Sequence, residues 1–329
     1  MTEFDCTVVV LTCDRPDLLS QALDGLSRQN LPPASVLVSD DSEGYASQLL
    51  VDRYPLLPIV YRKGPRAGQS ANLRGALAMV SSEFVVVLHD DDWWEPKLLA
   101  SARAAFDIRP SPDMFVPGMR FVDVHGTPLD RATAEFRRRR AAAFPGPLVL
   151  WKDAATRAHW LLERHVLAVF QGTVFRRSVL RDWLEGPSRG DLDDLWLCAE
   201  LSRPSSQPLR CAAVPELLCN YRVHGQSVAS NAGTYMDSSI AAFQAFRDDP
   251  DFASIRTVLA KRVRERAYQS AVQQAALGDR SRAHALLSRH CPRPRSVRER
   301  LLATAIMFPT SGLLRRVIVR RNDRFRVEG

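Results

Sequence analysis

The chain has 329 residues, of which 46% are hydrophobic and 25% are charged, and its formal net charge is +8. These values are ordinary for a globular protein and exclude an intrinsically disordered chain. No run reaches the roughly 18 apolar residues of a membrane-spanning helix, and residues 1–5 lack the basic start and apolar core of a secretory signal.

Arginine supplies nearly all of the positive charge, which indicates either anionic partners or the composition of a GC-rich bacterial genome. No basic-aromatic module is present, so we expect no nucleic-acid partner. The cysteines form no Cys-x-x-Cys pair, which excludes a zinc ribbon and a thioredoxin motif. We therefore expect a bacterial protein of the reducing cytoplasm.

Short apolar segments in the first part of the chain predict four strands, at residues 7–12, 36–38, 59–61 and 84–88. Helical spacing of apolar residues predicts helices over 18–26 and 70–79, and Asp14, with Pro16 after it, is the expected N-cap of the first. This alternation predicts an α/β fold with a mixed, mostly parallel sheet flanked by helices. Ligands of such sheets bind at the carboxyl ends of the strands.

The periodic pattern weakens after Pro96. The segment 110–118 is rich in proline, and the arginine run at 137–140 predicts an exposed loop or a helix end. Two more strands and one more helix are expected, at residues 171–175, 215–223 and 191–201. From about residue 249 the chain is rich in Arg, Ala and Leu, which predicts a helical extension.

The strongest chemical signal is the run His89-Asp90-Asp91-Asp92, which directly follows the strand predicted at 84–88 and precedes two tryptophans. Adjacent carboxylates repel one another, so placing them together costs stability unless a cation compensates. Carboxylate oxygens suit Mg²⁺ or Mn²⁺, which keep positions open for phosphate oxygens. The run predicts a divalent-metal site that handles the diphosphate of an activated donor; the alternative is a solvated acidic turn.

Two weaker signals accompany this acidic run. Asp40 and Asp41 follow the second predicted strand, where one carboxylate suits a nucleobase N–H and another a ribose hydroxyl; a strand-ending turn is the equal alternative. Gly68 to Asn72 opens a helix with small residues, and such an N-terminus can meet phosphate or ribose. Neither signal identifies a ligand by itself.

These motifs, in this order and preceded by the Thr-Cys-Asp-Arg-Pro turn at 12–16, resemble the family 2 glycosyltransferases of the GT-A fold. The resemblance is close over residues 6–100 and looser over 165–230. It implies a GT-A, Rossmann-like domain followed by a basic helical extension. The domains expected are a nucleotide-binding half at 1–100, an acceptor-binding half at 101–245 and the extension at 246–329.

The resemblance also implies roles for individual residues. Those expected to contact the nucleotide or diphosphate are Thr12, Asp14, Asp40, Asp41, Asn72, Asp90 and Arg222. Asp91 matches the metal ligand of the family's Asp-x-Asp motif, and His224, in an Arg-x-His element, is the second expected metal ligand. His89 stands where the family has the motif's first acid, so this chain departs from the pattern there.

The catalytic base is expected at the start of the helix predicted at 191–201. A gapless match to the family places Leu192 at the position of the base, so Asp191 or Asp193 would serve instead, with equal weight. Asp194 lies further into the helix and is expected to be structural. The alternative is that all three are acidic residues of the first turn, which the helix dipole favours.

Together the resemblance implies a metal-dependent, inverting glycosyltransferase of the hexosyltransferase type (EC 2.4). The donor would be a nucleotide-diphosphate sugar, with UDP or dTDP favoured, and the cofactor Mn²⁺ or Mg²⁺. The acceptor would be a glycan, a lipid-linked precursor or a secondary metabolite. The rival predictions are a sugar-nucleotide-binding protein with degenerate catalysis and a sugar-1-phosphate nucleotidyltransferase, which would need an early glycine-rich loop.

Two further features concern the membrane. The Gln-x-x-Arg-Trp signature of processive synthases is absent, so we expect a non-processive enzyme. The segment 313–321 interleaves apolar residues with arginines, which fits either peripheral contact with an anionic membrane or a solvated terminal element. The expected location is therefore the cytoplasm, with the inner membrane face as an option.

Overall fold

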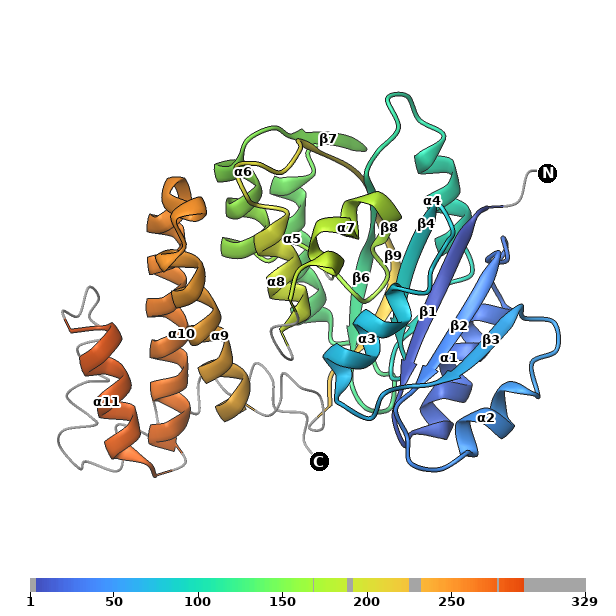
Figure 1. The fold of residues 1–329 in the computed structure, drawn as a ribbon, viewed down its shortest axis with the longest axis horizontal. Coiled ribbons are helices and arrows are strands. Elements are labelled where there is room, and N and C mark those ends of the chain that lie inside the picture. Colours follow the sequence, from blue (N-terminus) through green and yellow to red (C-terminus); the bar gives the residue numbers. More distant parts are fainter. Residues whose placement is uncertain (1–3, 168, 188–191, 225–231, 277, 293–329) are drawn as a thin grey trace. The chain divides into compact units, whose positions relative to one another are not determined.

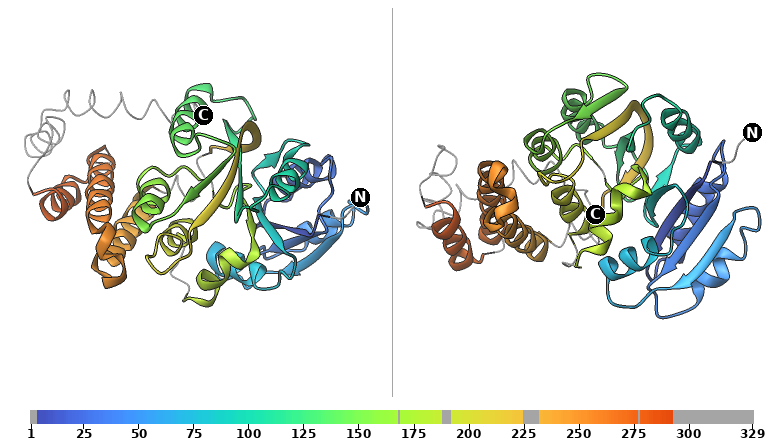
Figure 2. Two further views of the ribbon diagram at one scale, coloured as in Figure 1. Left: turned by 90° about the horizontal axis from the view of Figure 1, so that it is seen from above. Right: turned by 45° about the horizontal axis from the view of Figure 1, so that its top comes forward.

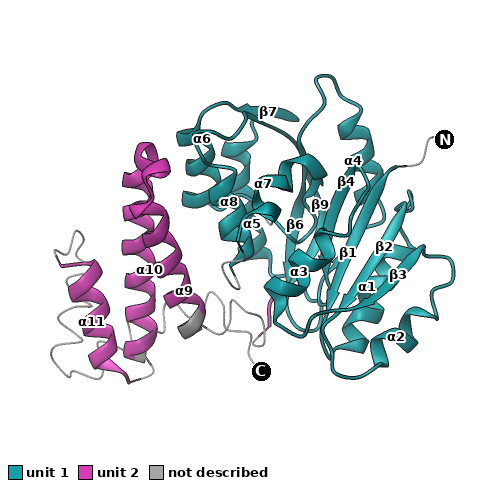
Figure 3. Cartoon of the chain, in the orientation of Figure 1, with its two compact units in different colours: residues 1–222 teal, residues 223–329 magenta. Residues whose placement is uncertain are grey.

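The structure is a computed structural model, and it describes residues 4–167, 169–187, 192–224, 232–276 and 278–292. The chain divides into two compact units, residues 1–222 and 223–329 (Figure 3). Helix α9 (Ala232–Asp248) belongs to the second unit, and the domain bounds expected at 100 and 245 remain a prediction.

The first unit begins with a parallel sheet. Its strands are β1 (Cys6–Thr12), β2 (Ser35–Asp40), β3 (Ile59–Lys63) and β4 (Phe84–His89). They pair in the order β3-β2-β1-β4, and all three pairs are parallel. The connecting helices are α1 (Pro16–Ser27), α2 (Ala46–Val51) and α3 (Gln69–Leu77). Helices α1 and α2 cover one face and α3 the other, because the strand order reverses at β1 (Figure 1).

Strand β1 forms the centre of the core because every one of its residues is buried. A parallel strand covered on both faces needs apolar side chains in both directions, and the Val-Val-Val-Leu sequence at 8–11 provides them. Leu19 and Leu23 of α1 are fully buried in the same hydrophobic cluster. The continuous apolar run that predicts this strand is therefore a direct consequence of its place in the sheet.

The start of α1 differs from the prediction at Asp14. The helix begins at Pro16, and the residue at the N-cap position is Arg15, without a side-chain cap. Asp14 has a positive φ of 53°, and its backbone N–H donates to Ser42 Oγ at 2.6 Å. Asp14 therefore turns the chain toward the end of β2, and the prediction that it caps α1 is wrong.

The second half of this unit continues the sheet with strands of mixed direction. These strands are β5 (Trp93–Trp94), β6 (Met114–Val122), β7 (Leu148–Trp151), β8 (Val174–Arg176) and β9 (Leu209–Arg222). The order continues as β4-β8-β6-β9-β5, with β7 paired to β9. Figure 2 shows the strands of this half, coloured from teal to yellow, beside the blue strands of the first half. Strand β8 runs antiparallel to β4 and β6, whereas β6 and β9 are parallel. The predicted mixed, mostly parallel sheet is confirmed.

Strand β6 includes part of the proline-rich segment 110–118, where no strand was predicted. Pro117 cannot donate to a neighbouring strand, and the register between β6 and β9 shifts between Val116 and Gly118. Gly118 permits the close approach there, because a Cβ atom on it would lie 2.2 Å from the carbonyl oxygen of Glu216. The irregularity therefore accommodates a proline inside a buried strand.

The remaining helices of the first unit lie around this second half of the sheet. They are α4 (Leu98–Phe106), α5 (Asp130–Ala143), α6 (Ala154–Ala158), α7 (Arg181–Glu185) and α8 (Asp193–Glu200). The arginine run at 137–140, expected in a loop or at a helix end, lies within α5. Arg140 is buried there, and its Nη2 donates to the carbonyl of Val116 at 3.0 Å.

The second unit contains α9, α10 (Arg256–Ala276) and α11 (Arg280–His290), which agrees with a helical extension. Its apolar contacts include the buried rings of Phe243, Phe246 and Phe252. No helix among the described residues has the length and apolar character needed to cross a membrane. The tail at 313–321 lies outside the described residues.

Candidate active site

The carboxyl ends of β1, β2 and β4 are joined by backbone hydrogen bonds, which bring the predicted site residues to one edge of the sheet. Asp41 N donates to Thr12 O at 2.9 Å, and Asp90 N donates to Leu11 O at 3.1 Å. Gly64, at the end of β3, donates to Asp40 O at 2.8 Å. Polar residues from four separate segments therefore meet here, as the α/β pattern predicts.

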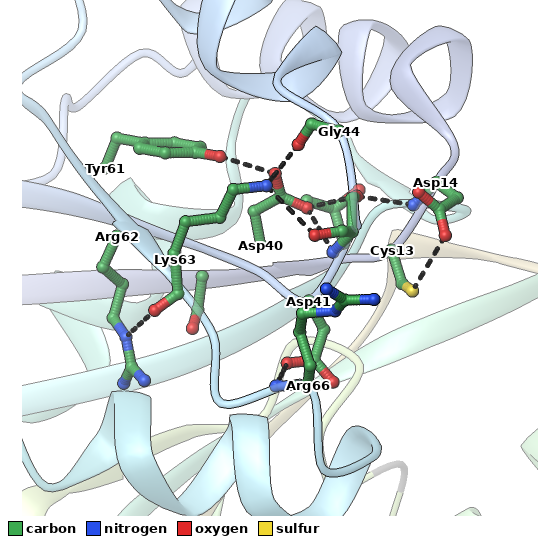
Figure 4. A network of polar contacts seen from close by, with 12 residues as sticks. Cys13, Asp14, Asp40, Asp41, Gly44, Tyr61, Arg62, Lys63 and Arg66 are labelled. Atoms are coloured by element: carbon green, nitrogen blue, oxygen red, sulfur yellow. Dashed lines mark hydrogen bonds and ion pairs between the residues drawn. The ribbon is translucent and has the colours of Figure 1, made fainter.

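The carboxylate of Asp40 is fully occupied by contacts within the protein (Figure 4). Its Oδ1 accepts from the backbone N–H and hydroxyl of Ser42, and its Oδ2 accepts from Tyr61 Oη at 2.5 Å and faces Lys63 Nζ at 3.4 Å. Burial raises the pKa of this carboxyl, but the hydrogen bonds and Lys63 outweigh it and hold the pKa below its usual value. Asp40 therefore fixes the turn after β2.

Asp41 is the more exposed member of the pair. Its Oδ1 accepts from the backbone N–H of Arg66 at 2.7 Å. The backbone passes very close here, since a Cβ atom on Gly64 would lie 2.4 Å from Asp41 Oδ1 and 2.5 Å from Asn72 Oδ1. Asp40 and Asp41 were both expected to contact the nucleobase. Of the two, only Asp41 has a side chain that is not buried.

Asn72 is buried in the first turns of α3 and links this helix to β2. Ser39 Oγ donates to Asn72 Oδ1 at 2.5 Å, and Asn72 Nδ2 donates to Ser39 O at 3.0 Å. Gly68 precedes the helix with a φ of 92°, a conformation that glycine adopts without strain. The predicted Gly-Gln-Ser-Ala-Asn helix start is confirmed, and its asparagine ties α3 to the site edge.

The acidic run after β4 is neutralised in part by Arg15. Arg15 Nη2 lies 2.7 Å from Asp90 Oδ1, and Nη1 lies 3.1 Å from Asp91 Oδ2. Thr12 Oγ1 also donates to Asp90 Oδ2 at 2.8 Å. Burial nevertheless raises the pKa of Asp90 to about 6, against the opposing effect of Arg15 and with Asp91 adding to the rise. The sequence motif did not assign a role to Arg15.

Asp92 is buried behind the other two acids. Its Oδ1 accepts from the backbone N–H of Arg222 at 2.9 Å, whereas its Oδ2 has no hydrogen-bond partner among the described residues. Burial, together with the charge of Asp91, raises its pKa well above the usual value. Asp91 is the most exposed of the three acids, since its side chain is 12% exposed, whereas Asp90 and Asp92 are buried.

Arg222, expected at the diphosphate, clamps the backbone around this run. Its guanidinium donates to the carbonyls of Asp91 and Val124 and to Gln21 Oε1, at 2.9, 2.7 and 2.8 Å. It also lies 5.1 Å from the ring centre of Trp93. These contacts place Arg222 beside the acidic run, and contact with a diphosphate remains a prediction. His224 lies in the second unit, and its metal role also remains a prediction.

His89, the first residue of the run, is the last residue of β4 and is half-buried. Its Nε2 atom is buried and has no hydrogen-bond partner among the described residues. Burial lowers the pKa of His89, while the negative charges of Asp91 and Asp194 raise it. These contributions bring Asp194, which the sequence indicated as structural, into electrostatic range of the motif.

The start of α8 separates the candidate bases. Leu192, at the family's base position, is buried, and so is Asp193, which is 7% exposed. Asp194 is exposed, and its Oδ1 accepts from the N–H of Leu195 at 2.8 Å. Asp191 lies outside the described residues. Asp194 was expected to be structural, and which acid of this segment serves as the base remains a prediction.

The donor set at this edge fits a divalent ion only if a ligand supplies further oxygens. No group of three His, Cys, Asp or Glu side chains in the described part of the chain is arranged to hold an ion. Mg²⁺ and Mn²⁺ are commonly bound by one or two carboxylates and substrate phosphates. Asp91, partly exposed between two buried acids of raised pKa, suits that kind of site.

Comparisons with known proteins agree with this geometry. The model of glycosyl transferase family 2 matches residues 7–184, more than half of the chain. No curated protein matches the sequence.

Two solved structures are similar in fold. TarS 1-349 of S. aureus, in complex with UDP-GlcNAc, has a TM-score of 0.62 and 16% identity over 97% of this chain and 92% of that chain. The mannosyltransferase PcManGT from Pyrobaculum calidifontis, in complex with GDP-Man and Mn²⁺, has a TM-score of 0.57 and 18% identity over 97% and 87%. The chain therefore belongs to glycosyl transferase family 2 and is a glycosyltransferase with the GT-A fold.

Proposed function

We propose that this glycosyltransferase moves a sugar from a nucleoside-diphosphate donor to an acceptor hydroxyl, with inversion at the anomeric carbon and help from a divalent cation. The observation that carries the proposal is the acidic edge after β4, where Asp90 and Asp91 share Arg15 and adjoin the turns after β1 and β2. The similar structures hold UDP-GlcNAc in one case and GDP-Man with Mn²⁺ in the other.

The nucleoside is assigned to the turn after β2. Asp41 is the proposed partner of the base, because Asp40 is buried and occupied by Ser42, Tyr61 and Lys63. Asp14 and the start of α3 adjoin this turn, the former through its backbone bond to Ser42. UDP and dTDP are the favoured donors, and the Asp41 carboxylate can accept the N3–H that uracil and thymine both present.

The cation is assigned to Asp91, with Mn²⁺ or Mg²⁺ completing its coordination from diphosphate oxygens and His224 as a candidate further ligand. When bound, the ion stabilises the negative charge that develops on the leaving nucleoside diphosphate. Arg15 and Thr12 hold Asp90 beside it. Arg222 holds the backbone of Asp91 in place, because its Nε donates a hydrogen bond of 2.9 Å to the carbonyl oxygen of Asp91.

The base is assigned to a carboxylate of the segment 191–194, which would take the acceptor proton as the hydroxyl attacks. Asp191 and Asp193 remain candidates, and Asp194 joins them because it is exposed and its charge acts on His89. Conversion of each of Asp193 and Asp194 to Asn separates them: the base variant loses transfer while binding of UDP persists. If both variants transfer sugar at the wild-type rate, Asp191 is left as the base.

The proposal is tested by incubating the protein with UDP-, dTDP- and GDP-sugars, an acceptor panel and Mn²⁺, and by following the anomeric signals by NMR. We expect a product of inverted configuration whose formation stops when EDTA removes the metal. Retention of configuration would contradict the inverting assignment. Undiminished turnover in EDTA would contradict the metal assignment. Glycans, lipid-linked precursors and secondary metabolites form the acceptor panel.

The cellular setting is part of the same proposal. We place the protein in the cytoplasm, where nucleotide sugars and reduced cysteines coexist, with the arginine-rich tail at 313–321 as a candidate contact for the inner membrane face. Flotation with vesicles of anionic and of neutral lipid tests the tail. Equal recovery with both lipids would remove the membrane contact from the proposal.

A further inference from the structure

Arg74 joins two helices that no sequence motif connects. It lies in the last turn of α3, and its Nη2 is within hydrogen-bond distance of three carbonyl oxygens at the end of α7. The contacts to Trp183 O and Leu184 O measure 3.0 and 2.9 Å, and the third acceptor is Gly186 O. The guanidinium also lies over the ring of Trp183, 4.6 Å from its centre.

The other end of α3 is fixed to the donor side of the site. Asn72, two residues before Arg74, exchanges two hydrogen bonds with Ser39 at the end of β2. Gly64 packs against both Asn72 and Asp41 at the same point. A rigid helix of nine residues therefore runs from the proposed nucleoside turn to the carbonyl groups of α7.

Helix α7 leads directly to the acids proposed as the base. It ends at Glu185, and α8 begins at Asp193, so the carbonyls held by Arg74 lie only a few residues before the acidic segment. The charge of Asp194 in turn acts on His89 at the end of β4. Helix α7 also packs against α8. Arg74 thus links the turn after β2 to α8 through α3 and α7.

We infer that Arg74 is a positioning residue, which holds the acid-bearing start of α8 at a fixed distance from the donor bound beside α3. This inference rests on the proposed function. A charged guanidinium makes stronger hydrogen bonds to carbonyls than a neutral donor, and it also covers the indole of Trp183. Loss of these bonds frees the end of α7 while leaving the turn after β2 intact.

The expected consequence is a split between binding and chemistry. Donor affinity depends on the turns after β1, β2 and β4, none of which Arg74 contacts through the bonds described above. Transfer requires the base near the acceptor hydroxyl, and a misplacement of about 1 Å at a catalytic group can cost roughly 100-fold in rate. Arg74→Ala should therefore lower kcat and leave the Kd for UDP nearly unchanged.

The experiment compares Arg74→Ala, Arg74→Lys and a matched control, Arg109→Ala, in the full-length protein. Arg109 is also a guanidinium over the carbonyls that end a helix, because its Nη1 contacts the carbonyls of Phe106, Asp107 and Ile108 after α4. Titration calorimetry with UDP and Mn²⁺ measures binding. Transfer at saturating donor and acceptor measures kcat.

For Arg74→Ala we expect kcat to fall by about 10- to 100-fold with a change in Kd below about twofold, and Arg74→Lys should recover part of the loss. Arg109→Ala should change neither quantity. A kcat equal to wild type in Arg74→Ala would overturn the inference, and so would equal loss of kcat and UDP affinity. If Arg74→Ala does not fold, Arg74→Lys and Trp183→Phe decide by the same criterion.

Failure of the proposed function has a different signature. In that case the wild-type protein itself transfers no sugar from any donor in the panel. Hydrogen exchange then still reports on the contact, because faster exchange of residues 181–186 in Arg74→Ala, with unchanged exchange in β2, supports the link between α3 and α7. Unchanged exchange in both segments would overturn it.

Discussion

The turns after β2 and β4 both place buried carboxyl groups at the same sheet edge, yet the protein treats them in opposite ways. Asp40 is surrounded by donors, and its pKa lies below the usual value because hydrogen bonds and Lys63 outweigh burial. Asp90 is buried as well, but burial raises its pKa to about 6 despite the ion pair with Arg15. The charge of Asp40 is balanced by Ser42 of the same turn and by Tyr61 and Lys63 of β3, whereas Arg15 and Thr12 do not offset the burial of Asp90.

This difference teaches which acidic motif is structural and which is poised for a ligand. A buried carboxylate with a complete set of donors stabilises the fold and gains nothing from a cation. The acidic run after β4, in which burial raises the pKa values of Asp90 and Asp92, should instead be stabilised when a cation binds. The sequence presents both as aspartates after a strand, so only the surrounding donors distinguish them. Substitutions in the two turns should therefore have different effects on activity and stability.

Asp91→Ala should have the largest effect, and this effect should be confined to activity. We expect transfer to decrease by about 100- to 1,000-fold, because the group proposed to hold the cation at the leaving diphosphate is removed. Stability should hold, since the change also removes repulsion with Asp90 and Asp92. Transfer assays with Mn²⁺ and thermal unfolding measure the two effects. Asp107→Ala, at an exposed surface pair, is the control. Wild-type turnover by Asp91→Ala would refute the metal assignment.

Asp40→Asn should instead act mainly on stability. Removing one partner of a buried, hydrogen-bonded charge costs roughly 3 kcal/mol near neutral pH. Because the folded pKa of Asp40 is lowered, its contribution is present above the unfolded value near 3.8 and is lost as the pH falls through the folded pKa. Urea unfolding of both proteins from pH 7 to pH 3 measures this. A difference that stays constant with pH would contradict the balanced-turn interpretation.

Asp90→Asn should show the opposite pH dependence. Because the folded pKa is raised to about 6, the folded state keeps a proton that the unfolded chain releases near 3.8. The contribution of Asp90 is therefore greatest at low pH and declines as the pH rises from about 4 to 6, by roughly 2 kcal/mol. The asparagine variant lacks this decline, so its stability relative to wild type should increase over that range. A parallel pH profile would show that Asp90 is already balanced by Arg15.

The parallel half of the fold was predictable because local sequence and tertiary environment agree there. Strands β1 and β4 are covered on both faces, so their apolar runs stand out. Strand β6 was missed because Pro117 argues against a buried strand, and the register shift that accommodates it depends on β9, about a hundred residues away. The full extent of helix α5, which contains Arg140, was not predicted, because four consecutive arginines interrupt the apolar periodicity of its sequence.

The location of the candidate site could be predicted from the sequence, but the roles of its individual residues could not. Motif order placed Asp40, Asp41 and the acidic run at one edge, which the backbone bonds confirm. It could not separate Asp40 from Asp41, because Tyr61 and Lys63 come from another strand. Arg15 and Arg74 escaped notice for the same reason, since their partners lie more than seventy residues away in sequence.

Gly64→Ala should have the smallest effect and shows how closely the turn after β2 is preformed. The added Cβ would lie 2.4 Å from Asp41 Oδ1 and 2.5 Å from Asn72 Oδ1, so both side chains must shift. Side-chain ends yield more readily than backbone, and we expect a stability loss of about 1 kcal/mol. UDP affinity should fall severalfold, because Asp41 moves. The matched control is Gly44→Ala in the same turn region, where an added Cβ meets nothing within 4 Å. Unchanged UDP binding by Gly64→Ala would mean that Asp41 does not hold the base, whatever the stability of the variant.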